Sequence, residues 1–63
     1  MTPTEFKDAR NALGLSVSEM ADAIQISDLR TLRRYEDGTR PISGTLSLLI
    51  RYFLKYGLPE EAL

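Results

Sequence analysis

Arginine residues are concentrated between Ser27 and Arg40, and their spacing gives the clearest candidate chemistry in this chain. Read as a helix, residues 27–38 (SDLRTLRRYEDG) place Arg30 and Arg34 on one face, and the opposite face consists of Leu29, Leu32, Tyr35 and Glu36. Guanidinium groups form paired hydrogen bonds with phosphate and with guanine O6 and N7. The segment is therefore a candidate nucleic-acid-reading helix. The alternative is a solvated surface helix whose arginines only confer solubility.

The residue types that most enzymes and metal sites need are missing. The 63 residues include no cysteine and no histidine, which excludes disulfides, thiolate metal sites and histidine-based catalytic triads. No clustered carboxylates and no glycine-rich phosphate loop stand in their place. We expect no enzyme activity, no catalytic residue, no metal and no cofactor. The length allows one domain, residues 1–63, with one small core.

The distribution of charge is more informative than its sum. The net charge is −1, but residues 27–40 hold four arginines against three acidic residues, while the remainder holds four basic and six acidic residues. Phosphate binding favours such a concentration of positive charge, although this one is weak. No apolar run reaches membrane-spanning length and the N-terminus lacks the basic start of a signal peptide. We therefore expect a cytoplasmic protein that does not enter a membrane.

Capping signals predict an all-α fold, a compact bundle of four to five short helices. The first helix begins with a capping box of Thr2 and Glu5 and ends at Gly14, and the second begins with a capping box of Ser16 and Glu19. A third helix over about residues 28–36 is capped by Ser27 or Asp28 and stops before Gly38. Helices 2 and 3, joined by a tight connection, read as a helix-turn-helix.

A fourth predicted helix, residues 44–56, is apolar over an unusually wide arc. We expect its core side to be Leu46, Leu49, Ile50 and Phe53, and its polar strip to be Ser47, Arg51 and Lys55. This leaves Leu48 and Tyr52 in need of a cover. The cover is either the tail, residues 58–63, or a second copy of the chain, which makes Leu48 and Tyr52 a candidate dimer surface.

Two charged residues fall on the apolar sides of their helices. Arg10 lies beside Phe6 and Leu13, and Glu36 lies beside Leu32. An unpaired buried charge costs several kcal/mol, about 3–5 when one partner of a buried pair is removed. We therefore expect a structural ion pair between Arg10 and Glu36. The alternative is that each side chain reaches solvent near its helix end.

Two blocks of sequence, residues 13–24 (LGLSVSEMADAI) and residues 31–38 (TLRRYEDG), resemble the lambda-repressor-like (Cro/C1, XRE) helix-turn-helix family. The resemblance covers about residues 4–56. This chain has one more residue between Ala21 and Tyr35 than the common pattern, and Gln25 replaces the usual turn glycine. The resemblance implies a helical domain that binds DNA as a dimer, and it also favours the ion pair of Arg10 and Glu36.

The resemblance further implies which residues contact DNA. Arg34 would reach base edges, Thr31 and Arg33 would contact bases or phosphates, and Arg40 would reach the backbone. The backbone amides of Ser16, Val17 and Ser18 would meet a phosphate. Arg30 joins this set by the helical wheel, and Ser27 by its place at the start of the third helix.

We therefore predict a sequence-specific double-stranded DNA-binding protein, a small bacterial or phage transcriptional regulator, most simply a repressor. Its recognition helix, about residues 28–36, would lie in the major groove, and a homodimer would bind two half-sites about one helical turn apart. The alternative is a protein-interaction module with the same fold, such as an antitoxin that binds a toxin or another regulator. The wide apolar arc of residues 44–56 and the acidic balance favour that alternative.

Overall fold

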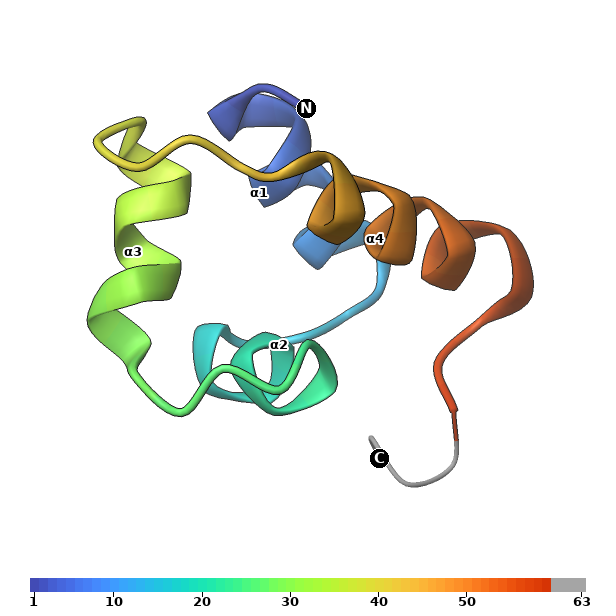
Figure 1. The fold of residues 1–63 in the computed structure, drawn as a ribbon. Helices are drawn as coiled ribbons and strands as arrows, with labels where there is room; N and C mark the ends of the chain where they lie inside the picture. Colours follow the sequence, from blue (N-terminus) through green and yellow to red (C-terminus); the bar gives the residue numbers. More distant parts are fainter. Residues whose placement is uncertain (60–63) are drawn as a thin grey trace.

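Four α-helices make up the fold: α1 Pro3–Ala12, α2 Val17–Ala23, α3 Leu29–Asp37 and α4 Gly44–Tyr56. The computed structural model describes residues 1–59, and no strand occurs in that range, so the all-α expectation is confirmed. α3 packs against both α1 and α2, and α4 packs against α1 (Figure 1). A fifth helix starting near Pro59 would lie almost wholly outside the described residues. Within residues 1–59, no helix is long and apolar enough to cross a membrane.

The helix starts follow the predicted caps. In α1 the Thr2 N–H donates to Glu5 Oε1 at 2.8 Å, and in α2 the Ser16 N–H donates to Glu19 Oε1 at 2.9 Å. The return bonds of both capping boxes are also present. These backbone bonds lower the pKa of the Glu5 and Glu19 carboxyls, because they stabilise the charged form. Of the two candidate caps for α3, Asp28 is the N-cap, so that helix starts at Leu29.

The core is built from all four helices around a centre of fully buried side chains. Phe6 of α1, Met20 of α2, Leu32 of α3 and Ile50 of α4 have no measurable exposure. The rings of Phe6 and Tyr35 meet with centroids 5.6 Å apart, a distance at which tilted aromatic pairs are favourable. Ala21 is buried as well, and its carbonyl accepts the Ile26 N–H at 2.8 Å. The chain after α2 is thereby held against that helix before α3 begins.

Two expectations about side-chain placement are wrong. Ser47, expected on the polar strip of α4, is buried, whereas Leu49, expected in the core, is 37% exposed. Ser47 precedes Ile50 by one helical turn, and these two residues and Phe53 are the buried ones of α4. Leu29, expected on the apolar face of α3, is also 37% exposed. It lies in the first turn of α3, away from the buried Leu32 and Tyr35.

The connection between α2 and α3 contains a left-handed residue that is not glycine. Gln25 has φ 61°, a conformation that costs an ordinary L-residue roughly 1–2 kcal/mol. Its side-chain Nε2 donates to the Asp22 carbonyl at 3.0 Å, which offsets part of this cost. Gln25 is the position where the related family pattern has glycine. The connection therefore keeps the turn geometry with a less suitable residue.

We expect Gln25→Gly to stabilise the protein by about 0.5–1 kcal/mol, because glycine adopts positive φ without a Cβ penalty. For a domain of this size that gain raises the melting temperature by roughly 2–6 °C in a circular-dichroism melt. Lys7→Gly, at an exposed α1 position with ordinary helical φ, is the matched control and should lose roughly 0.5–1 kcal/mol. A lower melting temperature for Gln25→Gly would show that the side-chain bond outweighs the strain.

Candidate nucleic-acid interface

The outward face of α3 is lined with arginine. Arg30, Arg33 and Arg34 are all exposed, while the inward face buries Leu32 and Tyr35. The Arg30 side chain retains 80% of its accessible surface. Within residues 1–59, Arg33 and Arg34 make no side-chain hydrogen bond or ion pair. Three guanidinium groups therefore project from one nine-residue helix with most of their donors free.

Two aspartates at the ends of α3 share this face. Asp28 Oδ1 accepts the Arg30 N–H at 2.9 Å and lies 3.4 Å from Arg30 Nε. The backbone bond from Arg30 lowers the pKa of Asp28, and the nearby Arg30 and Arg34 guanidinium groups lower it further. The Thr39 hydroxyl, together with its N–H, lowers the pKa of Asp37 by hydrogen bonding. Both carboxylates are thus ionised at neutral pH and offset part of the positive charge.

The structure brings Arg10 and Glu36 together in a bidentate ion pair. Arg10 Nε lies 3.0 Å from Glu36 Oε2, and Arg10 Nη2 donates to Glu36 Oε1 at 3.3 Å. The third branch of the guanidinium, Nη1, donates to the Leu15 carbonyl at 3.0 Å. Each side chain is only 14% exposed. One arginine of α1 therefore ties α3 to the start of the chain that leads into α2.

This ion pair changes the charge that α3 presents to solvent. Because Glu36 is neutralised by Arg10 from outside the segment, residues 27–40 present four arginines against only Asp28 and Asp37, a net charge of +2. The sequence alone gives the same segment +1. Both free carboxylates lie at the ends of α3. The middle of the exposed face, at Arg33 and Arg34, carries positive charge only.

Arg40 is placed at the C-terminal end of α3 by backbone bonds. The N–H groups of Gly38 and Arg40 both donate to the Arg34 carbonyl, at 3.1 and 3.2 Å. Gly38 has φ 86°, which allows the chain to reverse at this point. The Arg40 guanidinium carbon lies 5.9 Å from the Tyr35 ring centroid, within reach of a cation–π contact. Arg40 thus extends the basic surface of α3 into the loop.

The other predicted contact residues are less closely associated with α3. Ser27 is exposed in the connection, and Thr31 is half-buried on the flank of α3. Ser16, Val17 and Ser18 begin α2, and no hydrogen bond or ion pair within residues 1–59 joins them to α3. The Glu19 carboxylate occupies the Ser16 N–H there. A phosphate at this helix start would therefore meet a negative charge already in place.

A second surface is apolar and lies on α4. Leu48 is 70% exposed, Tyr52 56% and Tyr56 65%. The rings of Tyr52 and Tyr56 stack with centroids 4.8 Å apart, and Lys55 Nζ lies 5.2 Å from the Tyr56 centroid. Leu58 packs against the core, whereas tail residues 60–63, part of the expected cover, lie outside the described residues. We call the exposed residues Leu48, Tyr52 and Tyr56 the α4 strip.

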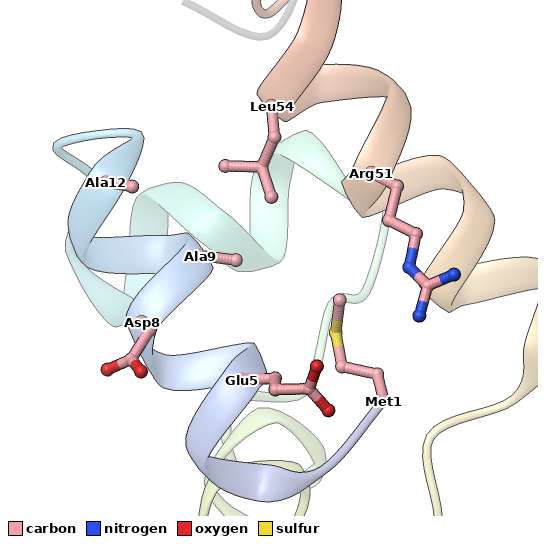
Figure 2. A pocket seen from close by; sticks show the side chains of 7 residues that line it. All are labelled: Met1, Glu5, Asp8, Ala9, Ala12, Arg51 and Leu54. Carbon is pink, nitrogen blue, oxygen red and sulfur yellow. The ribbon is translucent and has the colours of Figure 1, made fainter.

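A shallow groove of about 340 Å³ separates α1 from α4. Figure 2 shows Glu5 and Asp8 of α1 on one side and Arg51 and Leu54 of α4 on the other; Met1, Ala9 and Ala12 complete the lining. The carboxylate of Glu5 is already committed to its capping box. Within residues 1–59, acidic side chains do not gather in any group of three that could hold a metal ion. The arginine face of α3 remains the strongest candidate site.

Comparisons of the chain with protein-family models, curated proteins and solved structures gave no match.

Proposed function

We propose that this protein is a sequence-specific double-stranded DNA-binding regulator, in which α2 and α3 form a lambda-repressor-like helix-turn-helix. The observation that carries the proposal is the division of α3 into a clamped and a free face. Leu32, Tyr35 and the ion pair of Glu36 fix the inner face, while Arg30, Arg33 and Arg34 are exposed on the outer face. A helix held this firmly can present guanidinium groups in a fixed register.

The dimensions of α3 support the same proposal. Nine residues make a helix about 13 Å long, and the major groove of B-DNA is about 12 Å wide. In this arrangement Arg34 and Arg30 reach base edges, where arginine pairs best with guanine. Arg40 and Arg33 lie where the phosphates flank the groove. The net charge of +2 on residues 27–40 gives the modest electrostatic attraction that such a small interface needs.

A second copy of the chain is part of the proposal. A single helix in one groove makes few contacts, and a dimer reads two half-sites about one helical turn apart. The α4 strip supplies an exposed apolar surface for the second copy. It also supports the alternative function, a module that binds another protein such as a toxin. Both candidate functions use the same surface of α4, but only the first requires the arginines of α3.

The experiment that tests the proposal is selection of bound duplexes from a random pool, followed by titration of the enriched duplex over a salt series. Arg30→Ala and Arg34→Ala should each weaken binding roughly 5- to 100-fold, the loss of about 1–3 kcal/mol per base contact. They should also relax the preference for guanine in the half-site. Binding by the unaltered protein should weaken steeply with salt.

Arg51→Ala is the matched control, because it removes the same charge from α4 instead of α3. It should change the affinity less than two-fold. Equal selection and equal affinity for all three variants would refute the assignment of α3. Failure to bind even random duplex at low salt would leave the protein-interaction module as the better function.

A further inference from the structure

Leu29 is the apolar exception on the outer side of α3. It is the first residue of that helix and 37% exposed, although Leu32, one turn further on, is fully buried. Its immediate neighbours on the exposed surface are Arg30 in sequence and Arg33 one turn later. A leucine exposed by itself is ordinary. A leucine flanked by exposed guanidinium groups at the leading end of the candidate recognition helix needs an apolar group to contact.

The surroundings of Leu29 leave it free to make that contact. Asp28 caps the helix and draws Arg30 toward itself, with Oδ1 3.4 Å from Nε. Arg33 has no side-chain partner within residues 1–59. Side chains in the first turn of a helix point back toward its N-terminus. The Leu29 side chain therefore extends beyond the start of α3, in the region from which a groove-bound helix reaches base edges.

The major groove offers one apolar group on its base edges, the 5-methyl group of thymine. We infer that Leu29 selects a thymine in each half-site by burying that methyl group. The inference rests on the proposed DNA-binding function and adds to it a determinant of sequence. Guanine contacts of the arginines and a methyl contact of Leu29 would together define a half-site that contains both thymine and guanine.

The test replaces single thymines of the selected duplex with deoxyuridine, which removes the methyl group and leaves base pairing unchanged. For the unaltered protein, substitution at one thymine position should weaken binding about four-fold per half-site, the value of one buried methyl group. Both half-sites together should lose roughly 15-fold. Leu29→Ala should bind the thymine duplex and the uracil duplex equally well.

Two further variants keep the test sharp. Leu29→Met retains an apolar side chain and should retain the sensitivity to uracil, and Leu54→Ala, at an exposed leucine of α4, should leave it unchanged. Melting temperatures of all variants show that the loss is not one of folding. Uracil sensitivity at no thymine, or sensitivity that persists in Leu29→Ala, overturns the inference while DNA binding stands. Enrichment of no duplex overturns the proposed function and this inference with it.

Discussion

Arg10→Met should destabilise the protein by about 2–3 kcal/mol. The substitution leaves the Glu36 carboxylate without its bidentate partner and the Leu15 carbonyl without a donor, at a site where the pair is only 14% exposed. Removing one partner of a fully buried pair costs about 3–5 kcal/mol, and the residual exposure places this case below that range. A chain of 63 residues has roughly 3–9 kcal/mol of stability in total, so the loss is a large fraction. The measurement is the midpoint of urea unfolding at constant slope.

Three variants separate this effect from the mere loss of a charge. Lys7→Met removes a positive charge from an exposed position of the same helix and should cost less than about 0.5 kcal/mol. Glu36→Gln keeps an acceptor for Arg10 and should cost less than Arg10→Met. Arg10→Met combined with Glu36→Leu should recover most of the stability, because no charge is left unpaired. Equal stability of Arg10→Met and Lys7→Met would show that the pair contributes nothing.

Much of the backbone could be predicted from the sequence because helix ends are local. A capping box needs only a serine or threonine and a glutamate three residues later, and both predicted boxes are present. Gly38 ends α3 through its positive φ, and Gly57, also at positive φ, follows α4. These interactions span fewer than five residues. They depend little on how the helices pack, which is why the four helix positions follow from sequence.

Placement on a helix face was harder to predict where packing decides it. Ser47 and Leu49 are neighbours two residues apart, and a helical wheel gave them each other's environment. Hydrophobicity favours burying Leu49, but the direction of α4 is set by its contact with α1 and by the burial of Ile50 and Phe53. A small residue such as Ser47 can be covered at little cost. Leu29 differs from Leu32 for the same reason, since nothing covers the first turn of α3.

The candidate site could be predicted in part. The type and spacing of Arg30 and Arg34 gave their shared exposed face, because helical period alone determines it. The charge of that face could not be derived, since it depends on whether Glu36 is free or paired with Arg10, 26 residues earlier in the chain. Asp28 and Asp37 as partners of the arginine face were also missed as such. A signal existed for Asp37, because an aspartate two residues before threonine commonly forms a side-chain turn.

Leu48→Glu should convert the proposed homodimer into a folded monomer. Leu48 is the most exposed large apolar residue in the described part of the chain, so a carboxylate there stays in water in the monomer but would be buried unpaired in the α4 strip of a dimer. The new glutamate also stands three residues before Arg51, a spacing that supports a helix. The melting temperature of the isolated chain should therefore hardly change. Sedimentation equilibrium should give the mass of one chain where the unaltered protein gives two.

The same substitution should separate dimerisation from DNA recognition. On a duplex with two half-sites, the monomer loses the advantage of linked binding, about 100- to 10,000-fold in affinity. On a duplex with one half-site its affinity should match that of the unaltered protein, because α3 is untouched. Leu54→Glu, the matched control, places the same charge at an exposed leucine that lines the groove beside α1, outside the α4 strip. It should remain dimeric, and if it too becomes monomeric, the second copy does not dock on the α4 strip.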